Sequence, residues 1–460
     1  MVPDLALLGI FDFYMTEALD FNPFRHNSEA WIILAHVCRK WRDIVFGSPS
    51  RLNVRLLFKA RRSVKAMLDT WPPFLIDIWG SDLREWNVDN IVAALEHTDR
   101  IDKIELWDDS LFHVERTLAA MQKPFPSLTE LVVYFFSEMA AIVPDSLLSG
   151  SAPLLRSLRL KSTQFPLPQL QNLILSATNL VELSIWSIPN SGLISPEAMV
   201  TCLSRLKRLE EFELGVRSPR IWTSRHLSPS TRCVLPALTS LRFKGSCEYL
   251  EDLIASLDSP LLDNLDVSLL HQPRLASPQL ARFVDRTPKL KALHEAYVFF
   301  RSSEVYVSLP GTRPRGLDFR IKRVPSDHFS VMAQLCTLSI LRILIPMIKR
   351  LYIVDGSRPY LFRLNGIESS HWLDLLGPFT TVEVLYLSRE FSPHIVSALH
   401  GIIGEGTMEV LPSLQNLFLE QQVLAGRFEE DIKQFVSALH LSSRPMAVLQ
   451  WDREWFFHKY

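Results

Sequence analysis

The sequence predicts an α/β protein: an irregular solenoid with parallel strands on its concave face and helices on its convex face, preceded by a short all-helical module. Three observations lead to this fold class. A leucine-containing pattern recurs at regular intervals, segments with helical periodicity lie between its copies, and the first fifty residues fit helices but not the repeat. Because one such repeat cannot bury its apolar face alone, neighbouring copies must stack.

The recurring pattern is P-x-L-x-x-L-x-L, with clear copies in PSLTELVV, PLLRSLRL, PALTSLRF and PSLQNLFL. Each L-x-L predicts a short strand whose leucines point inward. The first leucine-like positions, spaced by 24 to 29 residues, are Ile101, Leu128, Leu155, Leu180, Leu209, Leu238, Leu262 and Leu290. This spacing lies within the range of leucine-rich repeats. The pattern defines no register after residue 310.

Segments with one apolar face connect these strands, and each predicts a helix that packs on the sheet while its charged face stays in water. They are residues 88–97, 114–121, 168–177, 196–206, 249–257, 277–287 and 392–403. The repeats lack the Asn that commonly follows the last leucine, so we expect an irregular array in which loops such as 217–234 replace a helix.

Residues 2–47 predict two helices that do not follow the repeat. The first is short, 2–11, and a polar break at 20–28 separates it from a longer helix at 29–47. The second helix is expected to carry a broad apolar stripe, with charged residues on its remaining surface. The stripe comprises Ala30, Ile33, Leu34, Val37, Cys38, Trp41, Ile44 and Val45.

The opening VPDLALLGIF, followed by VCRKWR, resembles the F-box, whose pattern is L-P-x-x-x-L-L-x-I-F and then V-C-[RK]-x-W-[RK]. The residues on that pattern, which the resemblance assigns jointly to adaptor docking or to the F-box core, are Pro3, Leu7, Leu8, Ile10, Phe11, Val37, Cys38 and Trp41. With the continuation at 46–58 and the repeats, the chain is similar to the large F-box families of mushroom-forming fungi.

The resemblance implies a function without catalysis. F-box proteins dock onto the Skp-family adaptor of SCF-type cullin-RING ubiquitin ligases through helical apolar surfaces, hold a protein substrate with their repeats, and carry no active site. The alternative is a leucine-rich-repeat interaction scaffold whose N-terminal helices only cap the repeats. An exposed apolar face on those helices would favour docking, and complete packing would favour capping.

The outward positions of the strands are the expected substrate contacts. If the strands stack in register, aromatic and basic side chains line the concave face, and such residues are favoured at interfaces. These candidates are Trp107, Tyr134, Arg159, Lys161, Trp186, Arg242 and Lys244. The alternative is that they only cover the sheet, and both interpretations stay open.

Charge and motifs argue against several other functions. The chain has 49 Lys and Arg against 50 Asp and Glu, so no global field attracts nucleic acid or a membrane surface. The basic run at 55–65 is therefore interpreted as a solvated face. Five scattered cysteines and thirteen histidines lack metal-ligand spacing, so we expect no metal and no cofactor. Cys38 is expected to be a buried apolar residue and not a nucleophile.

The sequence also predicts an intracellular protein. The N-terminus has no basic region before its apolar residues, so we expect no signal peptide. The apolar stretch 338–348 is interrupted by Arg342 and Pro346 and is too short to span a bilayer. We expect a soluble protein of the cytoplasm or nucleus, divided into a helical module (1–50), a linker or first cap (51–75) and a solenoid (76–460) with a C-terminal cap.

Overall fold

The computed structural model divides the chain into two compact units, residues 1–194 with 205–209 (unit 1) and residues 195–204 with 210–460 (unit 2). The structure describes residues 2–20, 30–58, 64–81, 88–136, 141–164, 167–188, 194–216, 232–270, 277–291, 293–300, 304–311, 316–322, 345–355, 369–403, 410–420, 430, 432–437 and 446–452.

Unit 1 begins with helices α1 (Asp4–Asp20), α2 (Ala30–Val37) and α3 (Arg39–Gly47). Two predictions about this region are wrong. The first helix continues to Asp20 instead of ending at residue 11, and the single helix expected over 29–47 is two helices. The break lies at Cys38, whose extended backbone (φ −160°, ψ 169°) interrupts the helical hydrogen bonding and starts α3.

The sheet of unit 1 consists of parallel strands in the order β1-β2-β3-β4-β6-β8. These are β1 (Arg55–Phe58), β2 (Leu75–Ser81), β3 (Ile101–Asp108), β4 (Glu130–Phe135), β6 (Ser157–Lys161) and β8 (Glu182–Ile188). The strands predicted from the leucine pattern are confirmed in this unit. β1 lies in the segment 51–75 and adds a strand ahead of the repeats.

Inward leucine-like residues form continuous rows across this sheet. Leu106, Val133, Leu160 and Ile185 are register partners on successive strands, and all are buried. Each such side chain contributes about 1.5–3 kcal/mol by leaving water. These buried rows explain why the L-x-L spacing specifies how neighbouring strands align in the sheet.

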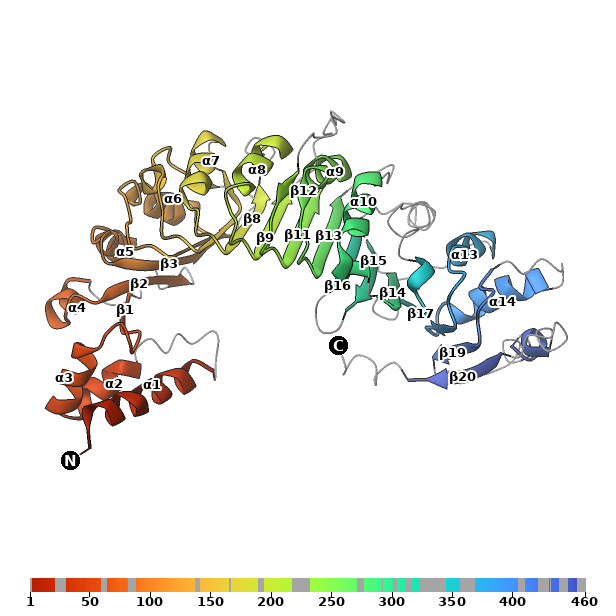
Figure 1. Ribbon diagram of the computed structural model, residues 1–460, viewed down its shortest axis with the longest axis horizontal. Helices are drawn as coiled ribbons and strands as arrows, with labels where there is room; N and C mark the ends of the chain where they lie inside the picture. The colour runs from red at the N-terminus through yellow and green to blue at the C-terminus, as the bar shows by residue number, and fades with distance from the viewer. Residues whose placement is uncertain are drawn as a thin grey trace. The chain divides into compact units, whose positions relative to one another are not determined.

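Helices connect the strands of unit 1 and lie along one side of its sheet (Figure 1). They are α4 (Val64–Thr70), α5 (Val88–Leu95), α6 (Leu111–Ala120) and α7 (Leu167–Ser176), with the 3-10 turn η2 (Leu147–Gly150) between β4 and β6. A short pair, β5 (Ala141–Ile142) and β7 (Thr163–Gln164), lies beside the main sheet. The predicted helices at 88–97, 114–121 and 168–177 are confirmed, with boundaries shifted by a few residues.

Unit 2 contains a larger sheet in the order β9-β11-β13-β16-β15-β14-β17-β18-β19-β20. Its strands are β9 (Glu211–Val216), β11 (Ser240–Gly245), β13 (Asn264–Leu270), β14 (Glu295–Phe300), β15 (Glu304–Pro310), β16 (Gly316–Lys322), β17 (Arg350–Asp355), β18 (Val384–Leu387), β19 (Asn416–Glu420) and β20 (Ala447–Trp451). Of the loop predicted at 217–234, residues 217–231 lie outside the described residues, and β10 (Cys233–Val234) pairs with β12 (Leu257–Asp258). Residues 453–460 of the predicted C-terminal cap also lie outside them.

The expectation of an all-parallel array is wrong at one place. β15 runs antiparallel to both β14 and β16, so β16 lies beside β13 and β14 lies beside β17. Gly316 lets the start of β16 approach β15 closely, because a Cβ there would lie 2.4 Å from the carbonyl oxygen of Leu309. This three-strand meander ends the regular repeat spacing near the point where the sequence pattern loses its register.

The helices of unit 2 are α8 (Pro196–Leu203), α9 (Cys247–Ala255), α10 (Pro278–Arg286), α13 (Ser369–Leu376) and α14 (Ser392–Ile403), with 3-10 turns η4 (Pro288–Lys291) and η5 (Ile345–Met347). The helices predicted at 196–206, 249–257, 277–287 and 392–403 are confirmed. The buried carboxylate of Glu251 joins two repeats by accepting hydrogen bonds from the amides of Gln279 (2.7 Å) and Leu280 (2.8 Å) at the start of α10.

Candidate protein-interaction surfaces

The inner side of the N-terminal helices is packed onto the start of the repeats. Trp31 of α2 is buried, and its ring centroid lies 5.0 Å from that of Trp71 and 5.5 Å from that of Phe74. Its Nε1 donates to the carbonyl oxygen of Arg55 at 2.9 Å. The helical module is therefore attached to β1 and to the connection between α4 and β2.

Three of the predicted F-box positions belong to the core of this module. Leu7, Leu8 and Phe11 are buried, and the Phe11 ring lies 4.7 Å from the ring of Trp41. The sequence left open which positions dock a partner and which form the core. Burial assigns these three to the core.

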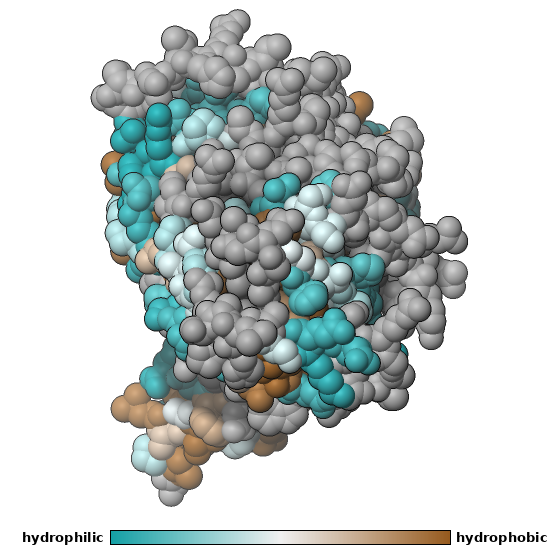
Figure 2. Space-filling view, turned by 90° about the vertical axis from the view of Figure 1, so that its right-hand side faces the viewer, coloured by the Kyte–Doolittle hydropathy of each residue, from teal (hydrophilic) through white to brown (hydrophobic). Residues whose placement is uncertain are grey.

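A second apolar set on the same helices faces water. Leu5 is 75% exposed, and the other members are Ile10 (56%), Phe13 (65%), Ile33 (60%) and Val37 (56%). At 3.6 residues per turn, Leu5, Ile10 and Phe13 lie on the side of α1 opposite the buried residues, and Ile33 and Val37 share one face of α2. Apolar side chains gather on this module, at the lowest part of Figure 2. We call these five residues the exposed apolar set.

Cys38 differs from its predicted place, whereas Pro3 lies at the start of the first helix, as the sequence predicts. Cys38 is exposed and lies outside any apolar stripe, because the helix break turns it away from the core; its carbonyl oxygen accepts from the amide of Arg42 at 3.1 Å. Pro3 precedes α1, and its carbonyl oxygen accepts from the amides of Ala6 and Leu7. The expectation that Cys38 is a buried apolar residue is therefore wrong.

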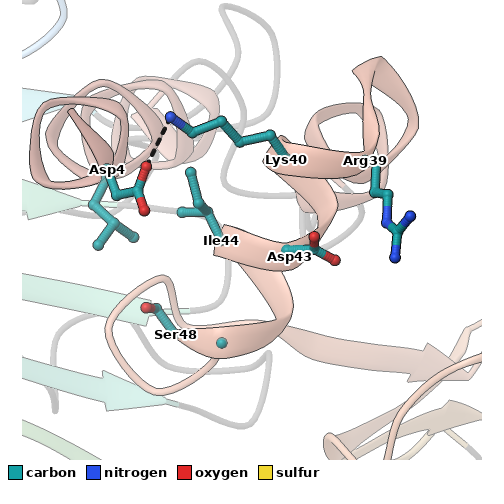
Figure 3. A pocket seen from close by; sticks show the side chains of 8 residues that line it. Asp4, Arg39, Lys40, Asp43, Ile44 and Ser48 are labelled. Carbon is teal, nitrogen blue, oxygen red and sulfur yellow. Dashed lines mark ion pairs between the residues drawn. The ribbon is translucent and has the colours of Figure 1, made fainter. Parts of the chain in front are cut away.

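A pocket of about 650 Å³ lies between α1 and α3. Figure 3 shows Lys40 reaching across to Asp4, where its Nζ lies 2.9 Å from Oδ1. Ile44 points to the same side of α3. Leu8, Arg39, Asp43, Gly47 and Ser48 complete the lining. The pocket places charged groups on the module that also carries the exposed apolar set.

The outward residues predicted for unit 1 do meet on neighbouring strands. Trp107 pairs in register with Tyr134, Tyr134 with Lys161, and Lys161 with Trp186. The ring centroids of Trp107 and Tyr134 are 4.5 Å apart, and all four side chains are half-buried. The sequence pattern therefore identified a real row on the face opposite the inward leucines.

The predicted arginines are held by acids of the same sheet face. Arg159 makes two hydrogen bonds to Glu182, at 2.5 and 2.7 Å, and these bonds raise the pKa of its guanidinium. Arg242 lies 2.5 Å from a carboxylate oxygen of Glu213 and 3.3 Å from one of Asp266. Lys244 lies beside them on β11. The two arginines are thus committed to structural ion pairs.

Asp266 is the most buried acid of this network. Arg320 also pairs with it, at 3.2 Å. Burial raises the pKa of Asp266 above its ordinary value, although Arg320 and Arg242 favour the charged form. Desolvation, together with the like charge of Asp318, therefore outweighs the two ion pairs at this carboxylate.

An aromatic row in unit 2 was missed by the sequence analysis. Tyr297, Tyr352, Tyr386 and Phe418 stack on successive strands, with centroid distances of 4.3, 4.2 and 4.4 Å. Trp451 packs against Tyr386 and donates its Nε1 to the carbonyl oxygen of Leu387 at 3.1 Å. A signal was present: Tyr386 and Phe418 stand between the two leucines of L-Y-L and L-F-L.

Within the residues that the structure describes, no three His, Cys, Asp or Glu side chains are grouped as a metal site. Burial raises the pKa of the Cys202 and Cys247 thiols, which disfavours reactive thiolates there. Over the same described ranges, no helix is long and apolar enough to span a membrane.

No protein-family model matches the sequence, and no curated protein matches it. Among solved structures, the chain is similar to the leucine-rich repeat-containing protein LegL7 from Legionella pneumophila, at 11% sequence identity and a TM-score of 0.28. The match covers 83% of this chain and 96% of that chain. Because a TM-score this low carries no argument, the assignment of strand–helix repeats rests on the register and burial described above.

Proposed function

We propose that the chain is the substrate-recognition subunit of an SCF-type cullin-RING ubiquitin ligase. Its N-terminal helices dock a Skp-family adaptor, its repeats hold a protein substrate, and it acts by binding without a catalytic step of its own. The observation that carries the proposal is the exposed apolar set, because it lies on the helices whose sequence resembles the F-box.

The energetics of α1 support docking. Its residues are apolar on both sides of the helix, and such helices are ordinarily covered on both sides. The inner side is covered by the module's own core, whereas the side with Leu5, Ile10 and Phe13 exposes large apolar surface. Covering each of these side chains with a partner would contribute about 1.5–3 kcal/mol before the costs of association.

The charged pocket beside α1 supports the same surface. Stable interfaces combine an apolar centre with a polar rim. Asp4, Lys40, Arg39 and Asp43 provide such a rim on α1 and α3. We therefore include the pocket in the proposed docking surface.

The packing of Trp31 favours a second candidate, a leucine-rich-repeat scaffold whose N-terminal helices only cap the first strands. Contacts to Trp71 and Phe74 stabilise such a cap. They involve the inner side of the module alone and leave the exposed apolar set without a role. The two candidates therefore differ in what that set does.

The test is co-purification of the full chain with a Skp-family adaptor. We expect Ile10→Glu combined with Val37→Glu to lose the adaptor while keeping the wild-type melting temperature, because both side chains are exposed. Phe112→Glu is the matched control: Phe112 is an equally exposed apolar residue on α6, outside the module, and this variant should bind normally. Normal binding by the double variant would favour the scaffold.

Phe11→Ala is unsuitable for the same purpose. Phe11 is fully buried against Trp41, so its truncation would unpack the module and remove binding under either candidate.

A further inference from the structure

We infer that Lys161, set among Trp107, Tyr134 and Phe136 on unit 1, binds a single carboxylate of an acidic peptide segment that also carries an aromatic or aliphatic side chain. This inference rests on the proposed function, since it names the class of substrate segment that the repeats would hold.

The first support is the regular placement of these residues. Trp107, Tyr134, Lys161 and Trp186 occupy one register row on four neighbouring strands, β3, β4, β6 and β8. Adjacent strands lie about 4.8 Å apart, so the row presents rings and an ammonium at even spacing. A row of this kind fits an extended segment that crosses the strands.

The second support is the charge of Lys161. Other cations of this sheet face have carboxylate partners: Lys103 pairs with Glu130 at 3.0 Å, and Arg159 is bound to Glu182. For Lys161, no carboxylate of the described residues lies within 4.0 Å; its Nζ lies 4.9 Å from the ring centroid of Phe136 and 5.9 Å from that of Tyr134. Within the described part of unit 1, its ammonium thus contacts aromatic rings and no carboxylate, which is the setting that an anionic group of a partner would complete.

The third support is the number of available cations. Phosphate groups are usually held by arginine clusters that bind several oxygens. Arg159, the neighbouring arginine, already gives two hydrogen bonds to Glu182. Among the described residues of this register row, the Lys161 ammonium is the one cation, and it matches one carboxylate rather than a phosphate dianion.

Glu105 is the nearest outward acid on β3, and it does not oppose such a ligand strongly. Its carboxylate accepts from Nε1 of Trp107 at 2.7 Å. It lies two strands from Lys161, about 10 Å away at the usual strand spacing, which is about one Debye length at 0.1 M salt. At that distance Glu105 adds little repulsion to an anion held by Lys161.

The rings define the second feature of the ligand. Phe136 is 52% exposed, and Trp107 lies 6.0 Å from it and 4.5 Å from Tyr134, measured between ring centroids. Half-exposed aromatic rings are favoured anchors for apolar side chains of a partner. A ligand that satisfies both features carries an acidic residue next to an aromatic or aliphatic one.

Selection of random 12-residue peptides on the purified full chain tests the inference. We expect the wild-type protein to enrich Asp or Glu beside an aromatic residue or Leu, and Lys161→Glu to enrich Lys or Arg at that position instead. Lys123→Glu is the control, a charge reversal at an exposed lysine after α6. It should enrich the same acidic peptides as the wild-type protein. Identical sets for wild type and Lys161→Glu, or no acidic enrichment by the wild type, would overturn the inference.

Fluorescence anisotropy with one enriched peptide tests whether Lys161 prefers a carboxylate or a phosphate group. The Asp peptide should bind Lys161→Gln about three- to tenfold more weakly than wild type, and its Asn counterpart should bind both proteins alike. Equal weakening of both peptides, or a phosphoserine version that binds wild type more than about tenfold tighter than the Asp version, would contradict the carboxylate assignment. These assays contain no adaptor, so their failure and a failure of adaptor docking are distinguishable.

Discussion

The N-terminal helices and the sheet of unit 2 use large apolar side chains in opposite ways. On α1 and α2, Ile10 and Val37 face water. In the sheet of unit 2, Tyr352 is stacked between Tyr297 and Tyr386 and is itself buried. The aromatic row stabilises its own unit, whereas the exposed apolar set contributes little to folding. This difference is why we place adaptor docking on the helices.

A second difference lies within the repeats, at the position between the two inward residues of each strand. In β9, β11 and β13 that position holds Glu213, Arg242 and Asp266, which pair with one another across strands. In β17 and β18 it holds Tyr352 and Tyr386, which stack. One position of the repeat is thus filled by ion pairs in one stretch and by rings in another.

The meander joins the two stretches through Tyr306. Its hydroxyl donates to Asp318 at 2.9 Å, and its ring lies 5.1 Å from the Arg320 guanidinium carbon on the charged side. On the aromatic side, the same ring stacks on Phe299 at 5.4 Å. Tyr306 therefore contacts both kinds of neighbour at the point where the ion pairs of this sheet face give way to stacked rings.

Breaking the aromatic row should have the largest effect on stability. We expect Tyr352→Ala to lower the free energy of unfolding by about 3–5 kcal/mol, because it removes a buried ring that stacks on both sides. Tyr352→Phe keeps the ring and should cost about 1 kcal/mol. Urea titration of both variants measures the difference. A loss below about 1 kcal/mol for the Ala variant would show that the row is not a stabilising element.

Removing the buried carboxylate between repeats should have the next largest effect. We expect Glu251→Ala to destabilise the protein by about 1–3 kcal/mol, because the Gln279 and Leu280 amides lose their acceptor. Glu251→Gln keeps one acceptor oxygen and should lose less. Denaturant unfolding followed by circular dichroism checks the order of the three proteins, and an equal loss in both variants would contradict this account.

A smaller effect is expected at Asp266, and it depends on pH. The pKa of Asp266 is raised in the folded state, so between its ordinary and its raised pKa the folded protein binds more protons than the unfolded chain. This contribution is complete below the ordinary pKa and is lost as pH rises through the raised one. Asp266→Asn should therefore gain stability relative to wild type as the pH rises from the ordinary pKa, about 4, through the raised one. Urea titrations across that range test the sign.

The smallest effect on stability is expected on the exposed apolar set. Ile10→Ser should change the free energy of unfolding by no more than about 0.5 kcal/mol, because the side chain is already in water. The same change should weaken adaptor binding, which isothermal titration calorimetry measures. If the variant instead loses several kcal/mol of stability, Ile10 belongs to the core and the comparison between helices and sheet fails.

Much of the fold could be predicted from the sequence because the signal is periodic. Leucine rows such as Leu106–Val133–Leu160 repeat in both sequence and space, so the spacing fixed the strands and the outward row of Trp107 and Tyr134. The meander could not be predicted, since β15 is an extra antiparallel strand between β14 and β16 that interrupts the spacing. The stacking of Tyr297, Tyr352 and Tyr386 was not predicted either, because without a repeat register their strands could not be aligned.

The N-terminal module shows why side-chain roles are harder to predict than element positions. The apolar residues of 29–47 fit one helical stripe, and nothing in their periodicity indicates the extended backbone of Cys38. Once the helix breaks there, Val37 and Ile33 face water while Trp31 turns inward. Burial on α1 likewise separates Ile10 from Phe11, which no pattern of adjacent apolar residues could do.

Hydrogen–deuterium exchange of the full chain, with and without a Skp-family adaptor, tests the docking surface most directly. The account predicts slower exchange over α1 and α2 in the complex, and unchanged exchange over β17, β18 and β19, whose rings are already covered by one another. Unchanged exchange over α1 and α2, or protection confined to the repeat strands, would contradict it.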